Sequence, residues 1–258
     1  MDLTVALGPD DRSRLTARRV SFPWSLGRGY PGAPGQPVKL IPQSAGAGLL
    51  AGDKVAQHIR VAPGASVHLQ SAGAMLTYGT PGGACSVSEW TVVVEPSARA
   101  FLMSEPYVLF EDAALAIRQK ITITPDATLV TCDGVVPATA SNTIEWQTET
   151  RVCRPDGIVL LNDRQRASPF ALARQRRMPG AWSCFGTVNI FAPETGNVRT
   201  ALEEATLKLN KSVWIGVAPV SAGLGLCVRI ASKDGQALRD ALLACAEASM
   251  KALQISCL

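Results

Sequence analysis

The most regular feature of this chain is an alternation of apolar and polar positions around a proline, which occurs three times. The stretches are IRVAPGASVHL at 59–69, VVVEPSARAFL at 92–102 and ITITPDATLVT at 121–131. In each stretch the apolar residues repeat with period two, which is typical of β-strands that bury one face. Because proline cannot donate a hydrogen bond to a sheet, each stretch predicts a strand, a tight turn and a second strand.

The spacing of these copies indicates a repeat architecture. The central prolines Pro63, Pro96 and Pro125 lie 33 and 29 residues apart, and a degenerate fourth copy, RVCRPDGIVLL, places Pro155 another 30 residues on. A single hairpin cannot bury its own apolar face, whereas stacked neighbours can. The pattern therefore predicts a mainly β fold, a helical stack of β-hairpin repeats resembling a β-helix. An ordinary β-sandwich with coincidental proline turns is the alternative.

The pattern changes near the C-terminus. SVSEWTVVV, ALAIRQKITI, VWIGVAPV and GLCVRIAS are strand-like, whereas residues 199–210 and 235–254 have helical spacing, the latter with Asp234 as its expected N-cap. We therefore expect a β-repeat body over residues 1–195. Residues 196–258 are expected to form a small C-terminal α/β portion with two helices, packed on the body as a single structural unit.

Composition narrows the class of protein. The 258 residues are 47% hydrophobic and 18% charged, which favours a buried core over disorder. A net charge of +4 and only 5% aromatic residues argue against a nucleic-acid partner. The seven cysteines form no CxxC pair and are expected to be buried or free thiols of a cytosolic protein. No signal peptide or membrane-spanning run is evident, so we expect a cytoplasmic protein without a membrane partner.

The sequence contains no motif of a common enzyme class. GxSxG, P-loop and HExxH patterns are all missing from it, and it has only two histidines. A hydrolase that uses Glu111 and Asp112 is the remaining enzymatic interpretation, but acidic pairs at strand ends are usually solvated. The arginine-rich stretch at 163–177 favours a solvated loop or a protein-docking surface over nucleic-acid binding. We therefore expect a protein that is not an enzyme.

Several blocks of the chain resemble, in the same order, the urease accessory protein UreD family, also called UreH. They are AGDKVAQHIRVAPGASVHLQSAGAMLTYG, TVVVEPSARAFLMSEPYVLFEDA, ITPDATLVTCD, IVLLNDRQ and LCVRIASKDGQALRDALLACAEASMKAL. The chain also departs from the family pattern. Ala51–Gly52 replaces a glycine pair, Met75 to Thr77 precede Tyr78 where a lysine is expected, and Ser104–Glu105 replaces a Pro-Gln pair. GVVPATASNTIEW stands in place of a GR…GE segment. The chain thus resembles a divergent member.

The resemblance implies a scaffold and metallochaperone that assists nickel insertion into apo-urease. Its partners would be the urease subunits and accessory proteins of the UreF and UreG type. Nickel in transit needs hard or borderline ligands that also release it, such as carboxylates along an interior channel. Asp53, Asp133 and Asp163 fall at acidic family positions and are expected to line this path or orient partners. The alternative is that they cap turns.

The remaining expectations concern partners and cofactors. Tyr78, Glu105, Arg164 and Arg229 are expected to contact partner proteins. No tightly bound cofactor is expected, because nickel would pass through transiently. A second interpretation is a β-repeat protein-binding module that has lost nickel delivery, which the altered segment after residue 133 favours.

Overall fold

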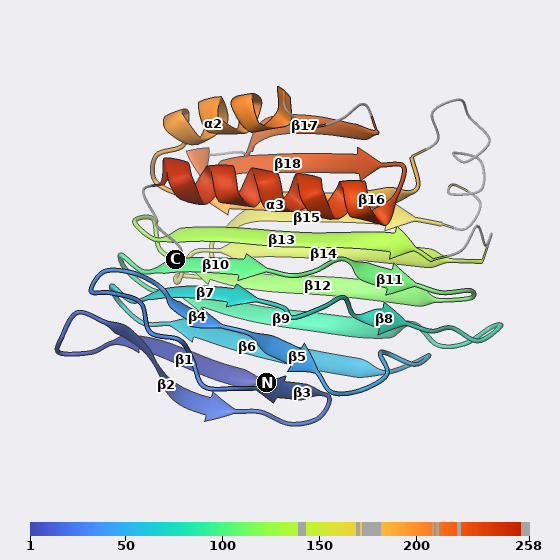
Figure 1. The fold of residues 1–258 in the computed structure, drawn as a ribbon, viewed down its shortest axis with the longest axis horizontal. Helices are drawn as coiled ribbons and strands as arrows, with labels where there is room; N and C mark the ends of the chain where they lie inside the picture. Colours follow the sequence, from blue (N-terminus) through green and yellow to red (C-terminus); the bar gives the residue numbers. More distant parts are fainter. Residues whose placement is uncertain are drawn as a thin grey trace.

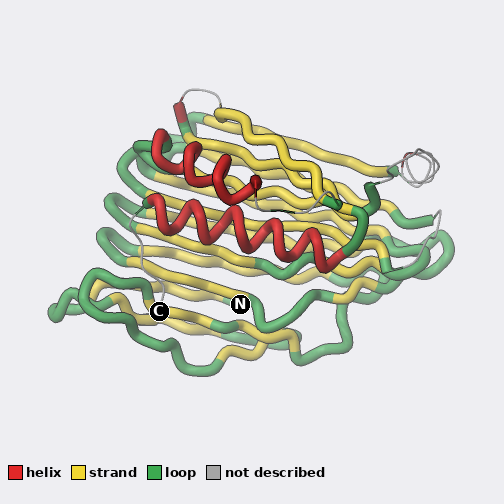
Figure 2. Tube along the Cα trace, turned by 45° about the horizontal axis from the view of Figure 1, so that its top comes forward, coloured by secondary structure: helices red, strands yellow, loops and turns green. Residues whose placement is uncertain are grey.

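The computed structural model describes residues 1–138, 143–168, 171, 182–207, 209, 212–220 and 223–253. In this part of the chain two β-sheets lie face to face, and two helices cover the outer side of one of them (Figures 1 and 2). The first sheet has seven strands. In spatial order they are β15 (Val159–Ala167), β14 (Glu145–Cys153), β12 (Ala114–Ile123), β9 (Ser86–Val94), β6 (Lys54–Val61), β1 (Asp2–Leu7) and β2 (Ser13–Arg19).

The second sheet has nine strands, and both helices pack on it. Its main path is β17 (Val213–Val220), β18 (Gly225–Ser232), β16 (Cys184–Phe191), β13 (Thr128–Pro137), β10 (Arg99–Met103), β7 (Ser66–Gln70) and β4 (Val38–Leu40). The short strands β11 (Tyr107–Leu109) and β8 (Leu76–Thr77) extend it. A separate pair is formed by β3 (Trp24–Leu26) and β5 (Pro42–Ser44), and the helices are α2 (Gly196–Leu207) and α3 (Gly235–Ala252).

The predicted fold class is confirmed: the protein is a mainly β stack of coils with two helices near its C-terminus. The predicted strands SVSEWTVVV and ALAIRQKITI coincide with β9 and β12, and VWIGVAPV and GLCVRIAS coincide with β17 and β18. β16 was not predicted. The expected N-cap is confirmed, because the Asp234 carboxylate accepts a hydrogen bond from the Ala237 N–H at 2.8 Å.

The hairpin pairing predicted for the repeats is wrong, because the strands that flank each of the first three prolines lie in different sheets. β6 ends at Val61 in the seven-stranded sheet, and β7 begins at Ser66 in the nine-stranded sheet. Each pairs in parallel with its counterpart in the next copy, β6 with β9 and β7 with β10. The turn between them is present, with the Ala65 N–H donating to the Ala62 carbonyl at 3.0 Å and Gly64 at φ +68°.

Burial explains why each repeat is an arch rather than a hairpin. Ile59 and Val61 before the turn and Ala65 and Val67 after it are all at most 1% exposed. In an arch the chain folds over, so the apolar faces of the two strands meet each other across the interior. Stacking the arches then extends both sheets by one strand per copy and lengthens the same core.

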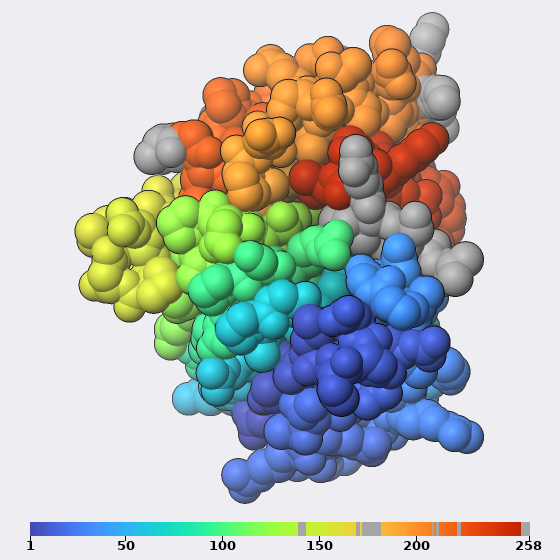
Figure 3. Space-filling model, turned by 90° about the vertical axis from the view of Figure 1, so that its left-hand side faces the viewer, coloured from blue at the N-terminus to red at the C-terminus, as the bar shows by residue number. Residues whose placement is uncertain are grey.

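The fourth copy departs from the other three. β14 and β15 pair antiparallel around a turn in which the Gly157 N–H donates to the Arg154 carbonyl at 2.9 Å, so this copy is a true hairpin. It forms the end of the seven-stranded sheet, while the other sheet continues through antiparallel β16, β18 and β17. Figure 3 looks along the strands, so the stack rises in the picture from blue to orange, and the yellow hairpin segment stands out on one side.

Helix α3 packs closely on the nine-stranded sheet over two glycines. Gly134 and Gly186 are direct partners on β13 and β16, and Leu238 and Leu242 of α3 lie over them. A Cβ atom on Gly186 would lie 3.0 Å from Leu238 Cδ1 and 3.1 Å from Leu242 Cδ2, which is tighter than ordinary contacts. The missing side chains therefore let the helix approach the sheet.

One buried apolar cluster joins strands β10, β13, β16 and β18 to both helices. The division into residues 1–195 and 196–258 as parts of one unit stays a prediction. Among the described helices, none combines the length and hydropathy that crossing a membrane requires.

Candidate functional site

A row of polar side chains crosses the interior between the two sheets. Its members on the seven-stranded sheet are direct neighbours across five strands: Gln57, Trp90, Gln119, Thr150 and Asp163. Its members on the nine-stranded sheet are direct neighbours across three strands: Asp133, Thr187 and Arg229. We call these eight residues the polar belt.

The polar belt interrupts an otherwise apolar interior. On β12 the side chains that share the face of Gln119 are Ile117 on one side and Ile121 on the other, and both are almost fully buried. Ile121 belongs to the cluster at the proline turns, whereas Ile117 belongs to a second cluster toward the opposite end of the strands. Burying polar groups costs free energy unless they find partners, so stability alone gives no reason for the belt.

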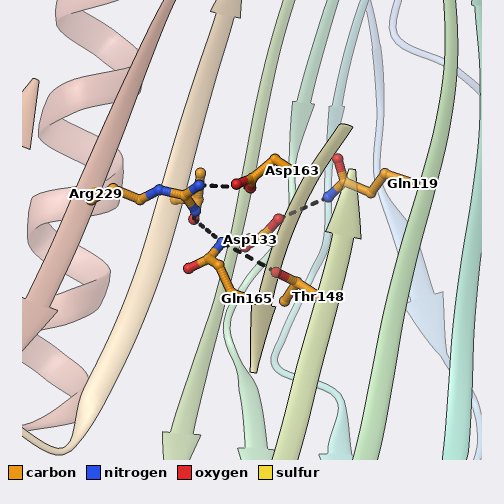
Figure 4. Close-up of polar contacts among 7 residues, drawn as sticks. Gln119, Asp133, Thr148, Asp163, Gln165 and Arg229 are labelled. Atoms are coloured by element: carbon orange, nitrogen blue, oxygen red, sulfur yellow. Dashed lines mark hydrogen bonds and ion pairs between the residues drawn. The ribbon is translucent and has the colours of Figure 1, made fainter. Parts of the chain in front are cut away.

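The charged groups of the belt lie close together (Figure 4). Gln119 Nε2 donates to Asp133 Oδ2 at 2.9 Å, and Arg229 Nη2 donates to Asp163 Oδ2 at 2.6 Å. Burial raises the pKa of Asp133 from 3.8 to about 7, while Arg229 lowers it and Asp163 raises it as smaller effects. Near neutral pH, Asp133 therefore exchanges between its protonated and ionised forms.

Hydroxyl and amide groups connect these charges across the interior. Arg229 Nη1 donates to Thr187 Oγ1 at 2.8 Å. Gln165 Nε2 donates to Thr148 Oγ1 at 3.1 Å on its own sheet and to Thr187 Oγ1 at 3.2 Å on the other sheet (Figure 4). The two sheets are thus joined by polar contacts as well as by apolar packing.

Several buried polar atoms in and beside the belt make no hydrogen bond within the described part of the chain. They are both amide atoms of Gln57, Gln119 Oε1, Thr131 Oγ1 and Asn189 Nδ2. Buried groups of this kind are normally satisfied by internal water. We therefore expect internal water along the belt. An ion in the belt could then exchange water ligands for side-chain oxygens as it moves.

The belt approaches the surface at both ends. At one end the side chains of Asp163 and Arg229 are 23% and 32% exposed. At the other end a narrow cleft of about 20 Å³ reaches Gln57 and Trp90, with Glu105 on its wall. A space of that size holds about one water molecule.

The structure brings together three of the residues that the sequence singled out. Asp133 and Asp163, expected on a nickel path, lie within the polar belt. Arg229, expected at a partner surface, lies on the same sheet as Asp133, with Thr187 between them, and binds Asp163 across the interior. Within the described residues, no three histidine, cysteine, aspartate or glutamate side chains gather as a ligand group for a metal ion.

Asp53 and Tyr78 lie away from the belt. The exposed Asp53 carboxylate accepts a hydrogen bond from the Leu50 N–H at 2.8 Å, which is the turn-capping arrangement considered as the alternative for this residue. The ring of Tyr78 stacks on Phe110, with the ring centroids 4.7 Å apart. Both residues stay candidates for the roles predicted from the sequence.

Arg164 and Glu105 form ion pairs at different surfaces. Arg164 points to the outer face of the seven-stranded sheet, where its Nη2 atom lies 2.9 Å from Glu149 Oε1. Of the arginine-rich stretch that begins there, residues 169–170 and 172–177 lie outside the described residues. Glu105 lies between β10 and β11 and is bound by Arg239 of α3.

Sequence reasoning missed Gln119, Thr187 and Arg239. For Gln119 a signal existed, because it replaces an apolar residue on the apolar face of ALAIRQKITI. Thr187 lies on the unpredicted strand β16, so its facing direction was not considered. Arg239 pairs with Glu105 across 134 positions, and no local pattern predicts such a contact.

Comparison with known proteins identifies the family. The family model described as UreD urease accessory protein matches residues 1–256. The chain belongs to the UreD family. Its UreD relatives include UreD 1 of Bradyrhizobium sp. strain BTAi1, 31% identical over 237 residues that cover 90% of this chain and 83% of that protein. UreD 3 of Bradyrhizobium sp. strain ORS 278 is 32% identical over 238 residues, covering 89% and 82%.

A more distant relative is UreD 1 of Pseudomonas syringae pv. syringae, 27% identical over 246 residues that cover 91% of this chain and 85% of that protein. These matches confirm the resemblance inferred from the ordered sequence blocks. Membership of the UreD family supports a role in urease maturation.

Proposed function

We propose that this UreD-family chain assists nickel insertion into apo-urease, in a complex with UreF and UreG type accessory proteins and the urease subunits. In this proposal it acts in the cytoplasm as a scaffold and metallochaperone, not as an enzyme. The observation that carries the proposal is the polar belt. It places carboxylate and amide side chains in an interior where apolar side chains would cost less free energy to bury.

The chemistry of the belt suits a cation in transit. Ni²⁺ accepts oxygen ligands from carboxylates, amides and water, and weak ligands release it readily. Asp133 can give up its proton when a cation arrives, because its pKa lies near neutrality. At Asp163 a cation meets the competing charge of Arg229, 2.6 Å from the carboxylate, which favours release over storage.

Asp53 is retained as a candidate for the nickel path, and Tyr78 and Arg164 as candidates for partner contacts. The second function, a protein-binding module without nickel delivery, rests on the sequence GVVPATASNTIEW that follows Asp133. Both functions involve the same partner proteins. They differ in whether nickel delivery to urease depends on the polar belt.

The test is co-expression with urease subunits and both accessory proteins in a host that lacks its own UreD. The chain should co-purify with these proteins and raise the nickel content of urease, and a double variant, Asp133→Asn with Asp163→Asn, should lower that content. Asp240→Asn, on the exposed face of α3, is the matched control. Failure to recover the partners contradicts both functions. Recovery with nickel content independent of the belt variants favours the binding module.

A further inference from the structure

Glu105 joins the connection between β10 and β11 to helix α3. Arg239 Nε donates to Glu105 Oε2 at 2.9 Å, and Arg239 Nη2 donates to Glu105 Oε1 at 3.0 Å. Two parallel charge-assisted hydrogen bonds hold a carboxylate in one orientation. The Glu105 side chain is only 14% exposed, whereas that of Arg239 is 43% exposed. The arginine is therefore the partner that can swing into solvent.

The cleft on whose wall Glu105 lies ends at the polar belt. Its outer part includes Ser71, whose Oγ accepts a hydrogen bond from the Glu105 N–H at 3.2 Å, and its inner part includes Gln57 and Trp90. Gln57 is 1% exposed, and neither of its amide atoms has a partner within the described residues. The same cleft thus borders both Glu105 and an unpartnered amide in the interior.

We propose that a divalent cation enters the polar belt through this cleft, with the Glu105 carboxylate as its first ligand and Arg239 as the cation that it must displace. The inference rests on the proposed function, because it concerns the same nickel path. We call the cleft at Glu105 the mouth of that path and the Glu105–Arg239 ion pair its latch. Once Arg239 has left, the carboxylate oxygens and the Gln57 amide oxygen supply hard ligands on the way to Gln119 and Asp133.

A second narrow cleft also borders Glu105 but offers a poorer route. It runs under α3 and is lined by Met103 and Cys132, whose sulfur atoms lie 3.5 Å apart. Among the described residues that line it there is no member of the polar belt, whereas Gln57 and Trp90 line the first cleft. A cation that entered here would therefore not reach the amide and carboxylate oxygens of the belt.

The latch makes a specific prediction about its two partners. Removing the charge of Arg239 leaves Glu105 free, so the cation no longer competes with an ion pair. Removing the charge of Glu105 takes away the first ligand. The two substitutions should therefore change nickel binding in opposite directions, which loss of a purely structural ion pair would not do.

The experiment uses the full chain, purified in its accessory complex, and Ni²⁺ alone as the probe. The variants are Glu105→Gln and Arg239→Gln. The matched controls are Glu203→Gln and Arg199→Gln, an exposed ion pair of 3.2 Å on the neighbouring helix α2. Nickel affinity is measured by equilibrium dialysis. Nickel delivery is measured as the nickel content of co-expressed urease, and thermal melting checks that each variant is folded.

Arg239→Gln should bind Ni²⁺ roughly two- to fivefold more tightly than its control. Glu105→Gln should bind it roughly threefold more weakly or worse, and deliver less nickel to urease. If the wild-type chain delivers nickel but both variants match their controls, the mouth at Glu105 is refuted while the proposed function stands. If the wild-type chain delivers no nickel, both the proposed function and the mouth at Glu105 are refuted. Equal losses in the two variants would make the pair structural.

Discussion

The burial of Asp133 leads to a prediction about how stability depends on pH. Its pKa is about 7 in the folded protein, against an ordinary value of 3.8. Between these two values the folded state holds a proton that the unfolded chain releases. The stability from this group is therefore fully present below about pH 3.8, is lost as the pH rises through about 7, and changes little above that. Asp133→Asn removes this dependence, because the amide stays neutral and its oxygen can still accept from Gln119.

The magnitude follows from the size of the pKa increase. A rise from 3.8 to about 7 corresponds to roughly 4 kcal/mol of lost stability once the group is fully ionised. Between about pH 5 and about pH 8.5, the wild-type chain should lose roughly 2 to 3 kcal/mol relative to Asp133→Asn. For a chain of 258 residues that difference corresponds to about 5 °C in melting temperature.

The assay is thermal melting of the wild type, Asp133→Asn and the control Asp240→Asn across that pH range. The stability of Asp133→Asn relative to the wild type should rise with pH up to about 7 and then level off, whereas the control should follow the wild type throughout. Parallel curves for all three proteins would refute the reasoning, because they would show that Asp133 titrates alike in the folded and unfolded states. A variant that is more stable yet delivers less nickel would indicate a functional reason for the buried carboxylate.

Four further predictions test the fold and the remaining residues. Ala65→Asp places an unpaired charge at a fully buried position and should abolish soluble expression, so a folded variant by circular dichroism would contradict the arch. Gly186→Val should lower the free energy of unfolding by about 1 to 3 kcal/mol in denaturant titrations, because α3 leaves no room for a side chain. An unchanged midpoint would count against that contact. Asp53→Ala should reduce the nickel content of co-expressed urease without unfolding the chain, and an unchanged content would leave Asp53 as a turn cap only. Burial raises the pKa of Cys245 to about 12, so alkylation followed by mass spectrometry should label exposed Cys85 well before Cys245. Equal rates would argue against that burial.

Local pattern identified the elements of this fold with good accuracy. The strand-like stretches SVSEWTVVV, ALAIRQKITI, VWIGVAPV and GLCVRIAS have the same bounds as β9, β12, β17 and β18, and α3 begins after its capping aspartate. These features depend on residues a few positions apart, which is why they can be read from the chain. β16 was missed because CFGTVNIF is buried on both faces, which removes the alternation.

The pairing of strands could not be obtained in the same way. Both a hairpin and an arch place a tight turn at Pro63 and bury alternate residues on either side of it. What separates them is whether β6 hydrogen-bonds to β7 or to β9, and that depends on the next copy of the repeat, about 30 residues away.

By itself, the sequence determined that this protein is a repeated β structure with a helical C-terminus and that it resembles the UreD family. It also marked Asp133, Asp163 and Arg229 as residues of interest. Only the tertiary structure decided that these three meet in one polar belt, and that Glu105 pairs with Arg239 beside a cleft that reaches the belt. The physical reason is that sheet register and helix packing join positions far apart in the chain, and the ionisation of a buried carboxylate is set by such neighbours and by burial.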